Sequence, residues 1–126
     1  DDISGYEPGV KTLYDQTGGA DTFMLVYENA RHNFAPHPAP KEAYQTDVEI
    51  GHYSEPAWSS ESLTRINEHM TLAFVNCYVK QNKEACAFLP KRQDATQLKQ
   101  ADGKLTPPWP GFPDRWGTGM QFYRKN

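Results

Sequence analysis

Four histidines and two cysteines are the side chains of this sequence best suited to chemistry near neutral pH. The histidines are His32, His37, His52 and His69. An imidazole can act as a general base or as a zinc ligand, and the spacing to other ligands separates these roles. A zinc site from His32, His37 and His52 is conceivable, but no compact spacing such as HExxH supports it. We therefore expect no metal and no cofactor, and His37, His52 and His69 are predicted to be structural or exposed.

The position of His32 is more informative than its type. It follows a nearly unbroken apolar and aromatic run at residues 22–27. A run without alternation predicts a strand covered on both faces, as in a parallel sheet flanked by helices. The loop after such a strand brings a histidine to the carboxyl edge of the sheet, where binding crevices form. A loop histidine alone is more often a surface residue than a catalytic base.

Cys77 and Cys86 are the only cysteines, nine positions apart. One pair cannot form the CxxC-type clusters of a structural zinc site. In an oxidising compartment the two thiols would bridge a helix end to the next segment, whereas in a reducing one they would stay free. The sequence leaves both alternatives open, and it does not fix whether the chain is cytoplasmic, periplasmic or secreted.

Several segments have the periodicity of regular structure. Residues 6–17 predict a short helix that stops at Gly18 and Gly19. Residues 60–81 predict the longest helix, capped by Ser59 or Ser60, with a short helical turn at 84–89 and a possible last strand at 119–124. The apolar face of the long helix consists of Leu63, Ile66, Met70, Ala73, Phe74, Cys77 and Tyr78.

A length of 126 residues corresponds to one domain. We expect residues 1–90 to form its core and residues 91–126 to form a tail, rich in proline and aromatic residues, that packs on the core. The tail is basic and the body acidic, but the basic residues are scattered singly, so no nucleic-acid partner is expected. No apolar run is long enough to span a membrane. Because the strand at 22–27 has no comparable partner strand, its sheet is expected to come from an upstream part of the protein, another chain or a swapped copy.

Five segments together resemble predicted dienelactone-hydrolase-like proteins of the α/β-hydrolase class. Residues 1–10 (DDISGYEPGV) resemble the segment after a late strand of that family, and residues 20–26 resemble its last strand. Residues 28–33 (ENARHN) are similar to its histidine loop. Residues 52–58 (HYSEPAW) and the helix that follows to Tyr78 resemble the region that leads into its final helix. Trp109-Pro110-Gly111-Phe112, with Gly117 and Gly119, resembles its C-terminal tail.

The resemblance implies the α/β fold class. The chain would be the C-terminal portion of an α/β-hydrolase and would contain the last sheet strand, the histidine loop, the final long helix and an extended tail. This portion would be incomplete without the upstream sheet. It implies a catalytic triad in the chain order nucleophile, acid, histidine. His32 would be the base, and Asp1, or else Asp2, the acid. The G-x-S-x-G elbow is absent, so the serine would lie on an upstream part or a companion chain.

Two functions follow as hypotheses from these expectations. The first is a serine hydrolase of small carboxylic esters or lactones, to which this chain contributes the acid and the histidine. The second is a non-catalytic piece that binds or assembles with something else. A homo-oligomer or a swapped dimer is compatible with either hypothesis.

Overall fold

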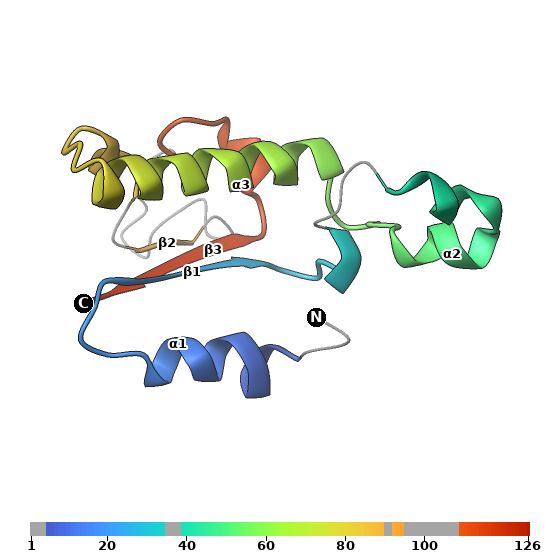
Figure 1. The fold of residues 1–126 in the computed structure, drawn as a ribbon, viewed down its shortest axis with the longest axis horizontal. Helices are drawn as coiled ribbons and strands as arrows, with labels where there is room; N and C mark the ends of the chain where they lie inside the picture. The colour runs from blue at the N-terminus through green and yellow to red at the C-terminus, as the bar shows by residue number, and fades with distance from the viewer. Residues whose placement is uncertain (1–4, 35–38, 90–91, 95–108) are drawn as a thin grey trace, which may run out of the picture.

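The computed structural model describes residues 5–34, 39–89, 92–94 and 109–126. These residues form a small sheet with the long helix α3 on one face and the short helix α1 on the other (Figure 1). The sheet contains β1 (Thr22–Tyr27), β3 (Met120–Lys125) and the three-residue β2 (Arg92–Asp94). The strand order is β1-β3-β2, and both pairings are antiparallel.

This sheet contradicts the predicted α/β-hydrolase fold. The strand at 22–27 is present as β1, but its partner is β3, and the two run antiparallel with Thr22 opposite Lys125. The expectation that the chain offers no partner for this strand is wrong, because the possible strand at 119–124 fills that place. An unbroken apolar run is typical of parallel strands, because parallel sheets are usually covered on both faces. Here helices cover both faces of an antiparallel strand, so the run does not indicate the direction of pairing.

The longest helix is confirmed. α3 spans Ser60–Phe74 and continues as a π-helical segment, Val75–Val79. The hydroxyl of Ser59 accepts a hydrogen bond from the Ser62 amide at 3.4 Å, which identifies the N-cap. Its apolar face packs on the sheet, and the core consists of Ile66, Met70, Ala73, Leu89, Trp109, Met120 and Phe122.

The predicted helix at 6–17 is also present, as a π-helical segment (Tyr6–Lys11) with a kink at Gly9, followed directly by α1 (Thr12–Gln16). This element covers the sheet face opposite α3 (Figure 1). The rings of Tyr14 and Tyr123 lie 6.4 Å apart, and the Lys125 ammonium lies 4.7 Å from the centre of the Tyr14 ring. These contacts anchor α1 to β3, the central strand.

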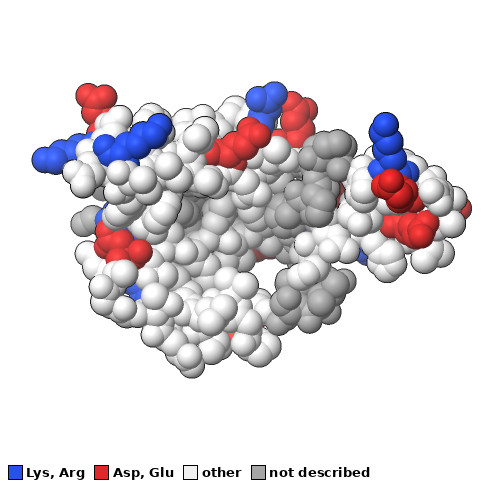
Figure 2. Space-filling view, viewed as in Figure 1, with Lys and Arg blue, Asp and Glu red and all other residues white. Residues whose placement is uncertain are grey.

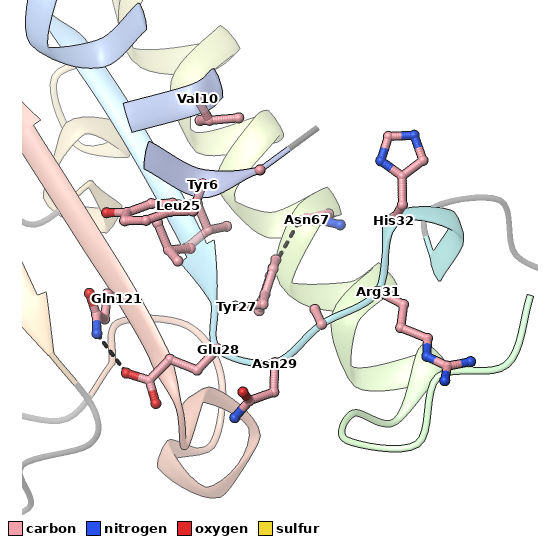
Figure 3. A pocket seen from close by; sticks show the side chains of 13 residues that line it. Tyr6, Val10, Leu25, Tyr27, Glu28, Asn29, Arg31, His32, Asn67 and Gln121 are labelled. Carbon is pink, nitrogen blue, oxygen red and sulfur yellow. Dashed lines mark hydrogen bonds between the residues drawn. The ribbon is translucent and has the colours of Figure 1, made fainter. Parts of the chain in front are cut away.

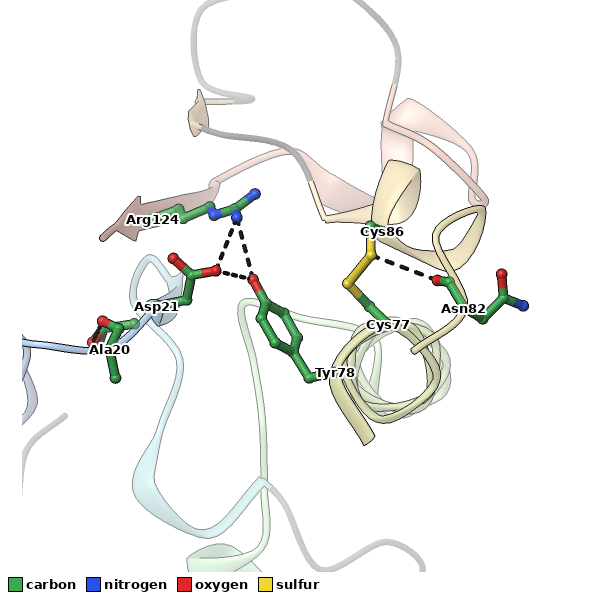
Figure 4. A network of polar contacts seen from close by, with 8 residues as sticks. Ala20, Asp21, Cys77, Tyr78, Asn82, Cys86 and Arg124 are labelled. Atoms are coloured by element: carbon green, nitrogen blue, oxygen red, sulfur yellow. Dashed lines mark hydrogen bonds and ion pairs between the residues drawn. A yellow bond between two sulfur atoms is a disulfide. The ribbon is translucent and has the colours of Figure 1, made fainter. Parts of the chain in front are cut away.

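A disulfide joins Cys77, in the last turn of the long helix, to Cys86 in the 3-10 helix Ala85–Phe88 (Figure 4). The structure thus selects the bridged alternative and confirms a helical turn near residues 84–89. Beside it, Arg124 on β3 donates to the Asp21 carboxylate at 3.1 Å and to the Tyr78 hydroxyl at 3.2 Å. The Tyr78 hydroxyl also donates to Asp21. These contacts hold the start of β1 to the end of the helix.

The remaining elements lie in loops. A 3-10 turn at His32–Phe34 follows β1, and another at Asp114–Gly117 precedes β3. A 3-10 helix (Lys41–Gln45) and α2 (Asp47–His52) form a lobe that stands off from the three layers (Figure 1). On the face in Figure 2, charged side chains gather over α3, over this lobe and near one end of the sheet, while the surface between α3 and α1 is largely uncharged.

Candidate functional site

A cavity of about 620 Å³ lies beside β1 and the loop that follows it. Its walls come from segments that are distant in the sequence: the first helical segment, β1, α3 and β3 (Figure 3). His32 lines it from the loop, at its exposed rim. The side chains that shape its interior include Tyr6, Val10, Leu25, Tyr27, Asn67 and Gln121.

The chain leaves β1 through a turn fixed by its backbone. The Glu28 amide donates to the Gly119 carbonyl at 2.9 Å, and the Glu28 carbonyl accepts from the Trp58 indole at 2.7 Å. Asn29 then adopts a left-handed conformation with φ of 61°, which asparagine tolerates better than most residues. This turn directs residues 30–32 along the cavity.

Glu55 holds the loop in front of His32. One carboxylate oxygen of Glu55 accepts from the Arg31 amide at 2.7 Å, and the other accepts from the amides of Ala57 at 2.9 Å and Trp58 at 3.2 Å. A charged acceptor shared by three amides makes a stronger connection than neutral hydrogen bonds. Glu55 therefore fixes the backbone next to His32 to the start of α3.

Two polar pairs face the cavity from its walls. The partly buried Tyr27 hydroxyl donates to the Asn67 side-chain oxygen at 2.8 Å, and desolvation raises the pKa of Tyr27 well above its usual range. The Gln121 amide donates to the Glu28 carboxylate at 2.6 Å. The phenol is therefore neutral at physiological pH, and the cavity combines apolar surface from Val10, Leu25 and Val26 with polar side chains, as many small-molecule sites do.

The predicted site residues are placed unequally by the structure. His32 lines the cavity, whereas Asp1 and Asp2 lie outside the described residues. Gly5, three residues after Asp2, lines the same cavity. The described residue nearest to the predicted acid, Gly5, and the loop with the predicted base thus line one cavity.

The other histidines lie elsewhere. His52 is exposed on α2 and lines a different cavity with Asn33, and His37 is outside the described residues. His69 packs between the rings of Phe88 and Phe112, with ring centres 5.4 and 5.6 Å away. Within the described ranges, no three His, Cys, Asp or Glu side chains are grouped as metal ligands.

Sequence reasoning missed the residues that build the walls. Glu55 belongs to the segment HYSEPAW, but nothing in that segment indicates that its carboxylate caps the His32 loop. Asn67 lies beside the apolar face of α3, where a polar residue is expected to be solvated. Gln121 alternates with the buried Met120 and Phe122, and this alternation is the one signal that places it on the opposite face of β3.

Comparison of the chain with known protein families, curated proteins and solved structures gives no match. None of the helices in the described part of the chain combines the length and apolar composition needed to cross a bilayer. The geometry of the cavity and the residues around it are therefore the basis for a functional proposal.

Proposed function

We propose that this chain supplies the histidine base, His32, and the acid, Asp1 or Asp2, of a serine hydrolase that acts on small carboxylic esters or lactones. The observation that carries the proposal is that His32 and Gly5 line the same cavity. Asp2 and Asp1 precede Gly5 by three and four residues, which span at most about 11 and about 14 Å. Either aspartate is therefore within reach of the cavity that His32 lines.

The chemistry requires few groups from this chain. In the proposed reaction the His32 imidazole accepts the proton of the serine hydroxyl as its oxygen attacks the ester carbonyl. The imidazolium then gives this proton to the departing alcohol oxygen, and an acyl-serine forms. Water, deprotonated by the same imidazole, releases the acid and restores the serine. The aspartate orients the imidazole and stabilises its charged form throughout.

The serine has to come from outside these 126 residues. None of the serines in the chain stands between glycines in a G-x-S-x-G elbow. In the proposal, an upstream part of the same protein or a companion chain brings the serine and the oxyanion-hole donors to the cavity. Among the described residues that line the cavity there is no cluster of cations for a highly charged substrate, which is compatible with a small ester or lactone.

The test is hydrolysis of short p-nitrophenyl esters and of a simple lactone by the protein isolated with every chain bound to it. Replacing His32→Ala should reduce kcat/KM by about 1000-fold or more, because triad members act as a unit. His52→Ala is the matched control, since His52 is exposed and lines a different cavity. Activity of the His32 variant within about threefold of wild type would rule out His32 as the base.

The second hypothesis, a non-catalytic assembly module, is favoured by a different observation. β1 lies at one side of the sheet, and its six residues carry no charge. An isolated protein that has no serine-bearing polypeptide and no esterase activity, yet binds another protein through this strand, would support the assembly role.

A further inference from the structure

The lobe of residues 40–53 buries few of its side chains within this chain. Its backbone hydrogen bonds, such as the one from the Ala43 amide to the Pro40 carbonyl at 3.0 Å, join residues of the lobe to one another. Tyr44 and Val48 are 65% and 74% exposed although both side chains are large and hydrophobic. Helices as short as these are marginal unless an apolar face packs on another element. We therefore expect the lobe to be covered in the working protein.

The end of the long helix, residues 75–89, presents a second hydrophobic surface. Val79 is 71% exposed there, and Phe88, in the 3-10 helix that follows, is 40% exposed. The disulfide between Cys77 and Cys86 holds these two segments together, and the Cys86 amide also donates to the Lys83 carbonyl at 3.2 Å. A surface that is fixed in this way loses little conformational entropy when a partner binds.

A cavity of about 370 Å³ opens beside Phe88 on this helix end. Phe88 and Ala85 contribute apolar surface to its lining, and Asn76 and Asn82 are among its polar residues. A lining of this kind suits an aromatic ring with a hydroxyl at its tip, because the ring is buried while the hydroxyl bonds to an amide. Tyr44 has this chemistry, and it is the most exposed aromatic residue in the described part of the chain.

The two surfaces carry opposite formal charges. The lobe has one lysine against three carboxylates, a net charge of −2, and the helix end has two lysines against one carboxylate, a net charge of +1. These exposed residues are Lys41, Glu42, Asp47 and Glu49 on the lobe, and Lys80, Lys83 and Glu84 on the helix end. Opposite charges favour contact between a lobe and a helix end, whereas like charges oppose contact between two lobes or between two helix ends.

We infer that the lobe of one chain docks on the helix end of a second copy, with Tyr44 in the cavity beside Phe88. In Figure 1 the lobe and the helix end lie at opposite ends of the molecule, so one chain does not make this contact with itself. Two copies that run in opposite directions make the contact twice, which closes a dimer. The inference does not depend on the proposed hydrolysis, because His32 and the cavity that it lines belong to neither surface.

A charge exchange tests the pairing of the two surfaces in the full chain. The double variant Glu42→Lys, Asp47→Asn makes the lobe net positive, and Lys83→Glu makes the helix end net negative. Each variant alone then brings like charges together, so its dimer dissociation constant, measured by sedimentation equilibrium, should rise by at least about tenfold.

An equal mixture of the two variants pairs every positive surface with a negative one. Its dissociation constant should return to within about threefold of the wild-type value. A wild-type chain that stays monomeric at every concentration, or a mixture that associates no more tightly than either variant alone, would overturn the inference.

Tyr44→Ser tests the hydrophobic part of the contact. Buried aromatic anchors carry much of the binding energy of an interface, so the dimer dissociation constant should rise by at least about tenfold. Leu13→Ser is the matched control, because Leu13 is 68% exposed on α1 and belongs to neither surface. Far-UV circular dichroism checks that both variants keep the fold. Equal dissociation constants for the two variants would contradict the role of Tyr44.

Photo-cross-linking locates the contact. In a mixture of isotope-labelled and unlabelled chains, Tyr44→p-benzoylphenylalanine should join a peptide from residues 72–89 of a different copy, and mass spectrometry identifies both peptides. The same probe at Leu13 should not yield this product. Attachment of the Tyr44 probe to the lobe of the second copy, to an unrelated protein or to nothing would contradict the docking.

Discussion

The two ends of β1 are built in opposite ways. At its start, Asp21 is held by Tyr78 and Arg124, close to the disulfide between Cys77 and Cys86 (Figure 4). At its finish, the chain passes into a loop that lines a cavity and carries an exposed histidine (Figure 3). Polar contacts hold elements together at both ends, and the second end in addition lines the cavity and carries His32 at its rim. Under the proposed function, the first end of β1 serves stability and the second end serves catalysis.

Removing the disulfide should have the largest effect on stability. The double variant Cys77→Ala, Cys86→Ala frees a loop of about ten residues, and chain entropy predicts a loss of about 3 kcal/mol in the free energy of unfolding. Urea unfolding measures this loss. If the two ends of β1 are independent, the proposed ester hydrolysis should be unchanged below the unfolding transition. A loss of this activity that parallels the loss of stability would show that the two ends are coupled.

Tyr27→Phe tests the wall of the open end. The variant removes the hydroxyl that donates to Asn67 and leaves the amide oxygen without this donor, which should cost about 1–2 kcal/mol in the free energy of unfolding. Thermal unfolding with the Asn67→Ala single variant and the double variant gives the coupling energy. A coupling near zero would show that the pair does not stabilise the cavity wall.

Glu55→Gln should affect function more than stability. Glutamine keeps one acceptor oxygen but loses the charge that serves the amides of Arg31, Ala57 and Trp58, so the loss in unfolding free energy should be about 1 kcal/mol or less. Because the loop before His32 loosens, kcat should fall by about tenfold with a smaller change in KM. Glu61→Gln, on the exposed side of α3, is the control. Equal kinetics for both variants would separate Glu55 from the site.

The smallest expected effect is the pH dependence of the closed end. The Tyr78 hydroxyl, and then Arg124, hold the pKa of Asp21 below its ordinary 3.8. The contribution of Asp21 is therefore fully present above about pH 4 and is lost as the pH falls through its lowered pKa. Burial, and then Asp21, raises the pKa of Tyr78 above its ordinary 10.0, so its contribution is present below pH 10 and is lost as the pH rises through the raised pKa.

Unfolding midpoints measured across pH for wild type, Asp21→Asn and Tyr78→Phe check both effects. The acid limb is the fall of the midpoint at low pH, and the alkaline limb is its fall at high pH. Asp21→Asn should flatten the acid limb, and Tyr78→Phe the alkaline limb. Identical profiles for all three proteins would show that this network does not contribute to stability.

The sequence predicts the local elements well because their signals are local. The run at 22–27, the helical periodicity at 60–81 and the stop after residue 17 each lie within one short window, and the structure has elements at all three. The direction of strand pairing was predicted wrongly because β1 and β3 are distant in sequence and coverage on both faces does not distinguish parallel from antiparallel neighbours. At the site, position after a strand indicated His32, whereas Glu55 and Asn67 reach the site only through tertiary packing.

The pairing of β1 with β3 also determines when the sheet can form during synthesis. From Tyr27 to Lys125 the ribosome adds 98 residues, which takes roughly 5–20 s at about 5–20 residues per second. During that interval β1 has emerged without β3, and the backbone of this strand, whose side chains carry no charge, is open to other nascent chains. The strand β1 thus stays without its partner strand for several seconds during synthesis. We expect the yield of native protein to depend on translation speed and on chaperones that shield residues 22–27.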